Sequence, residues 1–199
     1  MSHIAPVTLQ GWGVSLEPLG HDHADALMQA VQDGEIYKLN FTNAPDPTPE
    51  AVKNYIDKAL AGQANGSMLP FVVRTAGGDI VGSTRYYEIE PNVPTLCIGH
   101  TWYAARVQRT HVNTACKRLL LGHAFEKLDM AAVYFHTSHL NTRSQAAIER
   151  LGATRDGIIR NHKRHRDGAL RDTYWYSITA GDWPRVRDGL DAKLANVAR

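Results

Sequence analysis

The sequence contains only two cysteines among its 199 residues, Cys97 and Cys116, and both lie within apolar runs. No cysteine cluster indicates a disulfide framework or a metal site. Long hydrophobic stretches are also missing, because no apolar run approaches the length that crosses a bilayer and residues 1–10 lack the basic and then apolar layout of a signal peptide. These absences predict a protein of the reducing cytoplasm, with no membrane partner.

A strong charge of one sign is absent as well. Lysine and arginine number 22 and aspartate and glutamate 20, so the formal net charge is only +2. This bias is too weak to indicate a nucleic-acid partner by itself. With 43% hydrophobic residues and no internal repeat, the composition is typical of a globular chain with one core. We expect a single domain over residues 1–199.

Two helices are predicted in the first third of the chain. Apolar residues recur at helical spacing over residues 21–33, which indicates an amphipathic helix. After a proline-rich loop, Thr48 and Pro49 form the N-cap and first-turn proline of a second helix, and Gly62 stands where a C-cap glycine belongs.

Extended and helical segments alternate through the rest of the chain. The turn Ala76-Gly77-Gly78 is typical of a hairpin, and three further helices are expected to open near Asn113, Asn141 and Trp183. A basic loop is expected after residue 160. The predicted strands are residues 71–75, 79–89, 95–103, 131–138, 153–160 and 172–178.

This order of elements predicts one mixed α/β sheet with helices on both faces. The strand over residues 95–103, the helix after it and the strand over residues 131–138 form a unit whose two strands should pair in parallel. Ligands of such sheets favour the C-terminal ends of the strands. We therefore expect a site where the strand ending at Tyr103 meets the next helix.

The stretch QRTHVNTACKRLLL, which begins at Gln108, joins a polar segment to an apolar helical stripe. The polar half carries Arg109 and His111 and no carboxylate. Because the first turn of a helix has unpaired N–H groups and a partial positive charge, donors gathered there favour a bound anion. A solvated and capped first turn is the alternative.

A second polar feature opens the helix over residues 141–151. With Asn141 as the N-cap, Ser144 falls on the same stripe as Ile148 and Leu151. A hydroxyl on a buried stripe needs a partner, which a ligand could supply. The alternative is a hydrogen bond from Ser144 to a carbonyl one turn back.

The segment HKRHRDGALRD, from His162 to Asp172, is rich in cations. It could form a basic patch for RNA and make the protein a binding module without catalysis. No aromatic residues are interleaved to stack on bases, and Asp167 and Gly168 are typical of a hairpin turn. We therefore do not expect nucleic acid as a partner.

Three segments together resemble the GNAT superfamily of N-acetyltransferases, within its RimJ/RimL-like branch. They are TWYAARVQRTHVNTACKRLLLGHAF, NTRSQAAIERLGA and RNHKRHRDGALRDTYWYSI. The resemblance implies a GNAT-like fold, in which a mostly antiparallel sheet has one parallel strand pair at the cofactor cleft. It also implies acetyl-CoA as the cosubstrate, no metal, and a loop of pattern Q/R-x-x-G-x-G/A that holds the pyrophosphate. The residues so matched are Gln108, Arg109, Thr110, His111, Val112 and Asn113, followed by Thr114.

The resemblance also implies roles around the thioester. Asn141 would contact the pantetheine arm, Ser144 would protonate the departing thiolate as general acid, and the backbone N–H groups of Trp102 and Tyr103 would stabilise the oxyanion. Two departures stand out, since His111 and Asn113 fill both glycine positions and Cys97 replaces a glutamate that serves many relatives as base. His100 is the candidate base, with Glu88 and Asp172 as alternatives.

The resemblance thus implies direct transfer of an acetyl group to a primary amine. The acceptor would be a protein N-terminal α-amine or a small-molecule amine, because an α-amine with a pKa of about 8 is easier to present neutral than a lysine near 10.4. A catalytically weak CoA-binding regulator is the alternative. The oligomeric state is left open, with a homodimer among the options.

Overall fold

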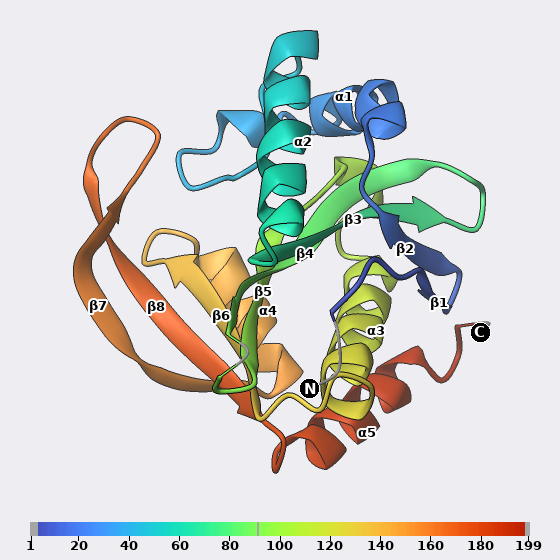
Figure 1. The fold of residues 1–199 in the computed structure, drawn as a ribbon, viewed down its shortest axis with the longest axis vertical. Helices are drawn as coiled ribbons and strands as arrows, with labels where there is room; N and C mark the ends of the chain where they lie inside the picture. Colours follow the sequence, from blue (N-terminus) through green and yellow to red (C-terminus); the bar gives the residue numbers. More distant parts are fainter. Residues whose placement is uncertain (1–3, 91, 198–199) are drawn as a thin grey trace.

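The computed structural model describes residues 4–90 and 92–197, so the first three residues of the N-terminal segment lie outside it. One eight-stranded sheet, in the order β1-β2-β3-β4-β5-β6-β8-β7, forms the centre of the molecule (Figure 1). The strands are β1 Leu9–Gly11, β2 Val14–Pro18, β3 Met68–Thr75, β4 Ile80–Glu90, β5 Thr95–Tyr103, β6 Ala132–Ser138, β7 Thr154–Arg164 and β8 Leu170–Thr179. The predicted strands are thereby confirmed, with small shifts at their ends.

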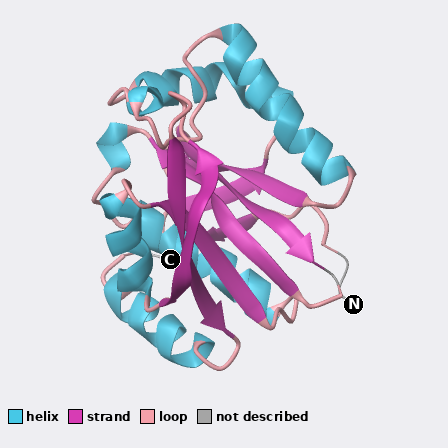
Figure 2. Cartoon of the chain, turned by 90° about the vertical axis from the view of Figure 1, so that its left-hand side faces the viewer, coloured by secondary structure: helices cyan, strands magenta, loops and turns pink. Residues whose placement is uncertain are grey.

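Helices cover both faces of this sheet (Figure 2). They are α1 Ala24–Gln32, α2 Pro49–Ala64, α3 Val112–Glu126, α4 Thr142–Leu151 and α5 Trp183–Leu194. On β4, Arg85 stacks on Tyr55 of α2 whereas the hydroxyl of Tyr86 donates to Leu120 of α3. Because successive strand residues face opposite sides, α2 and α3 lie on opposite faces. No helix in the described part of the chain is long and apolar enough to cross a membrane.

The N-terminal end of α2 follows the predicted capping chemistry, whereas its C-terminal end does not. Thr48 Oγ1 accepts from the N–H of Ala51 at 3.2 Å, and Pro49 occupies the first turn. The helix continues through Gly62 and ends at Ala64, so the predicted C-cap at Gly62 is wrong. A Cβ at Gly62 would lie 2.7 Å from the Met68 side chain, so this glycine permits close packing of α2 on β3.

The predicted parallel pair is present and short. Thr95, Leu96 and Cys97 of β5 pair with Ala132, Val133 and Tyr134 of β6, and beyond Cys97 the two strands no longer pair. On its other side β5 pairs with β4, with an irregular register near His100, whose φ is +50°. The sheet is therefore antiparallel elsewhere and open between β5 and β6 toward the N-terminal end of α3.

The C-terminal hairpin is longer than the sequence predicted. Residues 161–164 and 170–171, expected in a basic loop, belong to β7 and β8, and only residues 165–169 form the connection, where Gly168 has φ +85°. Exposed cations are common on an edge strand because they protect it from pairing with other chains. The short helix expected near Trp183 is the twelve-residue α5, with Trp183 buried against Phe125.

Candidate functional site

The opening between β5 and β6 brings unpaired backbone groups to one place. The N–H of Ala104 donates to Val81 of β4, and the carbonyl of Trp102 lies against Gly82 of the same strand. Hydrogen-bonding groups alternate along a strand, so the backbone of Tyr103 faces away from β4, toward the opening. The N–H of Trp102 instead faces β4. Of the two backbone N–H groups predicted as oxyanion donors, only that of Tyr103 is therefore available.

Thr101 lies two residues before Tyr103 on β5 and was not among the residues predicted from the sequence. It follows His100 directly, at the irregular part of β5. Its side chain lies on the α3 face, where Oγ1 contacts Thr84 Oγ1 at 2.7 Å and accepts from the buried Lys117 at 3.2 Å. Burial lowers the pKa of Lys117 to about 8.

The loop from Gln108 to Thr114 needs no glycine in the places where the family pattern has one. His111, the N-cap of α3, has φ −68°, and Asn113 lies inside the helix. The left-handed residue is Arg109, with φ +62°. His111 Nε2 lies 3.8 Å from the Cβ position of Gly13, so its ring extends toward the first hairpin. The substitution at His111 therefore strains no backbone and keeps the ring close to β1 and β2.

The first turn of α3 keeps free donors. Thr110 Oγ1 accepts from Val112 N–H at 3.3 Å, and the first backbone bond of the helix runs from Ala115 to His111. Within the described chain, the N–H groups of Asn113 and Thr114 have no acceptor. This is the arrangement that binds phosphate at helix N-termini.

The second predicted segment is organised as expected at its start. Asn141 Oδ1 accepts from the N–H of Ser144 at 3.0 Å, and Gln145 donates to the carbonyls of Ser138 and His139, which fixes α4 to the end of β6. Ser144 is half-buried rather than on a fully buried stripe. Its hydroxyl has no partner in the described part of the chain, so the predicted alternative, a bond one turn back, is not formed.

The sheet surface opposite α3 carries a cluster that we call the histidine face: Tyr87, Cys97, His100, His136 and Trp175. The rings of His100 and His136 meet the Tyr87 ring edge to face at centroid distances of 5.0 and 6.0 Å. The ring centroids of His136 and Trp175 are 3.5 Å apart. These residues come from β4, β5, β6 and β8. The cluster thus borders the opening between β5 and β6 on the side away from α3.

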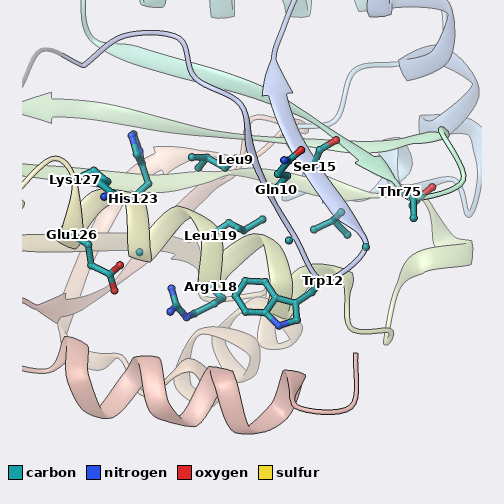
Figure 3. Close-up of a pocket in the computed structure, with 15 residues that line it drawn as sticks. Leu9, Gln10, Trp12, Ser15, Thr75, Arg118, Leu119, His123, Glu126 and Lys127 are labelled. Atoms are coloured by element: carbon teal, nitrogen blue, oxygen red, sulfur yellow. The ribbon is translucent and has the colours of Figure 1, made fainter. Parts of the chain in front are cut away.

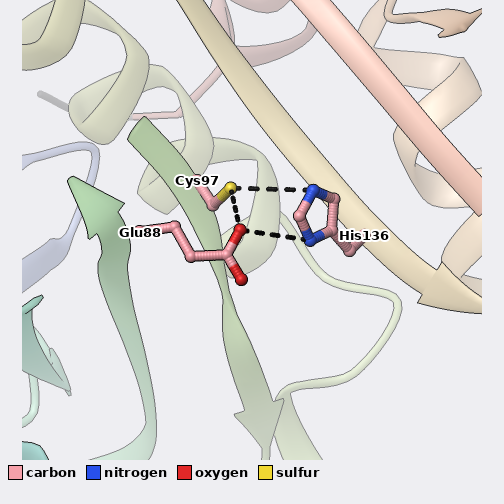
Figure 4. A group of neighbouring side chains, drawn as sticks. All are labelled: Glu88, Cys97 and His136. Carbon is pink, nitrogen blue, oxygen red and sulfur yellow. Dashed lines mark hydrogen bonds and ion pairs between the residues drawn. The ribbon is translucent and has the colours of Figure 1, made fainter. Parts of the chain in front are cut away.

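Glu88 adds a carboxylate to the histidine face. Cys97 Sγ lies 3.3 Å from Glu88 Oε2 and 3.7 Å from His136 Nε2, and Glu88 Oε2 is 3.6 Å from His136 Nδ1 (Figure 4). The Glu88 side chain is 48% exposed, whereas that of His136 is 2% exposed. Glu88 therefore presents a solvent-accessible carboxylate beside Cys97, where the family glutamate is missing.

Burial controls the charges on this face. Burial, and then the cations Arg85 and Lys163, lowers the pKa of His100 to about 3. Burial and then Glu88 raise the pKa of the Cys97 thiol well above its usual range. Burial also lowers the pKa of His136, although Glu88 acts in the opposite sense. At neutral pH the two imidazoles are thus uncharged and the thiol is protonated.

Glu88, Cys97 and His136 also offer one metal-ligand atom each, all within 4.8 Å of one another. A thiolate, an imidazole and a carboxylate are ligands that zinc accepts, with a fourth position open. Binding would require loss of the Cys97 proton, which burial and Glu88 oppose. The expectation that the protein uses no metal stays a prediction.

A sizeable cavity lies elsewhere in the described part of the chain. It has a volume of about 710 Å³ and opens between the first hairpin and α3, lined by residues such as Trp12, Arg118 and Glu126 (Figure 3). None of the residues predicted to hold the cofactor lines it. It lies at the β1–β2 edge of the sheet, whereas the opening between β5 and β6 is in the middle. The cavity is therefore separate from the residues predicted to hold the cofactor.

The cations of the C-terminal hairpin are not gathered into one patch. Arg166 pairs with Asp46 at 2.7 Å, and Asn40 makes two hydrogen bonds with Asp167, so the tip of the hairpin is tied to the loop before α2. The charges of Lys163 and Arg171 instead favour lower pKa values on the histidine face, Lys163 at His100 and both cations at His136. This arrangement gives no support to an RNA-binding patch over residues 162–171.

Comparison with known proteins gives the family and the fold. Residues 14–154 match the family described as the acetyltransferase (GNAT) domain. The FsC-acetyl coenzyme A-N(2)-transacetylase of Aspergillus fumigatus is 25% identical over 196 residues, covering 92% of this chain and 80% of that protein. A proposed acetyltransferase of T. thermophilus is 33% identical with a TM-score of 0.85, over 96% of this chain and 99% of the other.

A more distant solved structure shares the fold. Mycobacterium smegmatis RimJ, solved in complex with CoA-disulfide, has a TM-score of 0.80 and 22% identity, over 94% of this chain and 95% of the other. Its likeness concerns the fold. The family match, in contrast, spans well over half of the sequence, and on that ground the chain belongs to the GNAT family of acetyltransferases.

Proposed function

We propose that this acetyltransferase moves the acetyl group of acetyl-CoA directly to a primary amine, either the α-amine of a protein N-terminus or the amine of a small molecule. The observation that carries the proposal is the early end of β5–β6 pairing, which leaves strand backbone exposed beside a helix N-terminus with free donors. A thioester laid along β5 would place its diphosphate at that helix.

The cofactor would be held from both ends of this opening. The N–H groups of Asn113 and Thr114 would bind the pyrophosphate, with Arg109 and His111 close by, while Asn141 would meet the pantetheine arm. Gln108 Nε2 donates to the carbonyl of Tyr103 at 2.9 Å, so the loop is fastened to the strand end it serves. Such fastening limits the freedom that binding must remove.

The oxyanion would form where Tyr103 and Thr101 direct their N–H groups into the opening. Donors fixed before the reaction stabilise developing charge without reorganisation, which is the main advantage of an oxyanion hole. The buried ammonium of Lys117, bonded to Thr101, adds positive potential from the α3 face. These groups would lower the barrier to attack on the thioester carbonyl.

Glu88 is the base that the geometry favours. An imidazole with a pKa of about 3, as at His100, has little tendency to take a proton from an ammonium or an attacking amine. Glu88 lies beside the strand position that lacks the family glutamate, and its carboxylate is accessible. The proton would pass from the amine to Glu88, directly or through one water.

The remaining steps balance without a covalent enzyme intermediate. The amine forms a C–N bond to the acetyl carbon, the C–S bond breaks, and the CoA thiolate takes a proton from Ser144, whose hydroxyl has no protein partner in the described chain. Ser144 then regains a proton from solvent, and Glu88 releases the amine's proton to solvent, so each residue returns to its starting state. Cys97 is a poor nucleophile because its thiol stays protonated. Direct transfer is therefore favoured over an acetyl-cysteine route.

A thiol-release assay tests this function. The enzyme is mixed with acetyl-CoA and a panel of peptides and small amines, and free CoA is followed with a thiol reagent, with and without a metal chelator. We expect amine-dependent CoA release that the chelator does not change. Tight CoA binding without release for any acceptor would instead identify a regulator, and loss of activity on chelation would assign a metal to Glu88, Cys97 and His136.

A further inference from the structure

Arg85 of β4 is a buried cation without a counter-ion. The residue is 3% exposed, and its contacts are a weak hydrogen bond to Met68 Sδ at 3.5 Å and the ring of Tyr55, 4.8 Å from the guanidinium carbon. Its Nε atom is buried without a partner. A guanidinium has five donors and stays charged at any pH of interest, so most of its hydrogen-bonding capacity is unused here.

Leaving such a group unpaired is expensive for the folded state. A buried charge is normally paired, since removal from water costs several kcal/mol that only a partner recovers. No ion pair within the described residues includes Arg85, although this chain forms such pairs elsewhere, as between Arg118 and Asp191. The stacking on Tyr55 satisfies the face of the guanidinium and not its N–H groups.

The surroundings of Arg85 are electropositive. The positive charges of Arg85 and Lys163 both lower the pKa of His100. The charge of Arg171, whose Nε is also buried without a partner, favours lower pKa values at Tyr87 and His136. Glu88 is the carboxylate that interacts with this cluster, and it is already engaged by Cys97 and His136. The histidine face therefore lacks one anionic group near Arg85.

The backbone of Arg85 also lies close to the reacting end of the opening, and its guanidinium lies against Tyr55 of α2 and Met68 of β3. Arg85 pairs in register with Gly99, which precedes His100 and Thr101. With a strand spacing near 4.8 Å and a rise near 3.3 Å per residue, the Cα atoms of Arg85 and Thr101 are roughly 8 Å apart. An anion on Arg85 and an amine at the thioester would thus belong to one small molecule, or to the first residues of one peptide.

We propose that Arg85 binds a carboxylate of the acceptor, so that the preferred substrates are amines that carry a carboxylate a few bonds away. This inference rests on the proposed acetyl transfer and adds the chemical class of the acceptor. Arg85 acts as a specificity residue, because a bidentate guanidinium–carboxylate pair fixes the acceptor's orientation. Arg171 supports the same negative charge from β8.

The first test uses the wild-type enzyme and matched acceptors. Free L-amino acids are compared with their carboxamides, and a peptide that begins with glutamate is compared with one that begins with glutamine. Amidation lowers the pKa of the neighbouring amine and makes it the easier nucleophile, so a preference for the acid cannot arise from amine basicity. In the pair whose acid is the better substrate, we expect kcat/KM to be at least tenfold higher for the acid than for its amide.

Variants assign that preference to Arg85. Arg85→Met should bring the ratio of acid to amide close to one, mainly through a higher KM for the acid, and Arg85→Lys should retain part of it. The matched control is Arg187→Met, an exposed arginine on α5, which should keep the wild-type ratio. Thermal melting and CoA affinity show whether Arg85→Met is folded.

Binding to the CoA-loaded enzyme separates this proposal from the proposed function. If calorimetry shows that an acid binds in preference to its amide while no CoA is released, the carboxylate site stands and the transferase function fails. If acids and amides are acetylated equally, transfer stands and the Arg85 proposal is overturned. The Arg85 proposal is also overturned if no carboxylate probe binds and none is acetylated.

Discussion

The two faces of the sheet beside β5 treat their buried polar groups differently. On the α3 face, Tyr86 donates to Leu120 at 2.6 Å and Lys117 donates to Thr101 at 3.2 Å. On the opposite face, Nε of Arg85, Nδ1 of His136 and Nε1 of Trp175 are buried without hydrogen-bond partners. Native structures leave few such groups unpaired, and each one calls for a reason. The α3 face also has an unpaired group, the Tyr103 hydroxyl, but the unpaired side-chain nitrogens beside β5 gather on the opposite face, where a polar ligand could meet them.

The comparison predicts that substitutions on the histidine face change rates with little effect on stability, whereas substitutions on the α3 face change stability as well. Glu88→Gln is the sharpest case. Loss of a general base costs about 10²- to 10⁴-fold in rate, so kcat should fall by at least about a hundredfold while the melting temperature changes little. Steady-state kinetics and thermal melting measure both quantities.

Two variants serve as references for Glu88. Glu90→Gln alters a carboxylate two residues further along β4, whose side chain caps Asn92, and should leave kcat near the wild-type value. His100→Asn tests the rival base. If His100→Asn abolished turnover and Glu88→Gln did not, the assignment of the base would be reversed.

Lys117→Met tests the contribution of a buried cation on the α3 face. Burial lowers the pKa of Lys117 from 10.5 to about 8, so the unfolded chain holds this proton more firmly than the folded one. We expect the methionine variant to be more stable by up to about 3 kcal/mol at neutral pH, the equivalent of that shift. Some of this gain is offset, because Thr101 loses its donor.

The stability difference between Lys117→Met and the wild type depends on pH, and the lowered pKa of Lys117 fixes the direction of that dependence. Between about pH 8 and pH 10.5 the unfolded state of the wild type binds more protons, so its free energy of unfolding rises with pH relative to that of the variant. The advantage of methionine should therefore be largest below pH 8 and shrink above it. Urea unfolding at about pH 7 and about pH 9.5 measures the difference, and an advantage that grows with pH would contradict it.

Ser144→Ala is expected to have the smallest effect. Its hydroxyl is without a partner in the described chain, so it resembles the histidine face more than the α3 face, and its loss should not lower the melting temperature. Turnover should fall by about tenfold, with little change in CoA affinity, because a proton donor to the leaving thiolate is lost. Thr142→Ala, on the exposed side of α4, is the control. Unchanged turnover would remove Ser144 from the mechanism.

Local sequence signals predicted much of this fold. The cap at Thr48, the glycine turn before β4, and α4 between Asn141 and Gly152 each depend on neighbouring residues alone. The parallel pair followed from the order of elements. Gly62 misled because a glycine near a helix end can serve packing as well as capping.

Features that depend on pairing between distant strands could not be predicted. The contact of Glu88 with Cys97 follows from the register of β4 on β5, and the irregularity at His100 shifts that register. The orphaned state of Arg85 depends on α2 and β4 together. The sequence marked His111 as a departure from the family's glycine, and its φ of −68° shows that the position needs no glycine here, whereas the left-handed residue of the loop is Arg109.

The short pairing of β5 with β6 has one more consequence. From Ile98 onward, the side of β5 that faces β6 is an interior strand edge without a neighbour. An extended pantetheine arm, with its two amides, can occupy that edge as a substitute strand. The sheet would then be continuous only in the loaded enzyme, and slowed amide hydrogen exchange at Thr101 and Tyr103 on addition of CoA would report its completion.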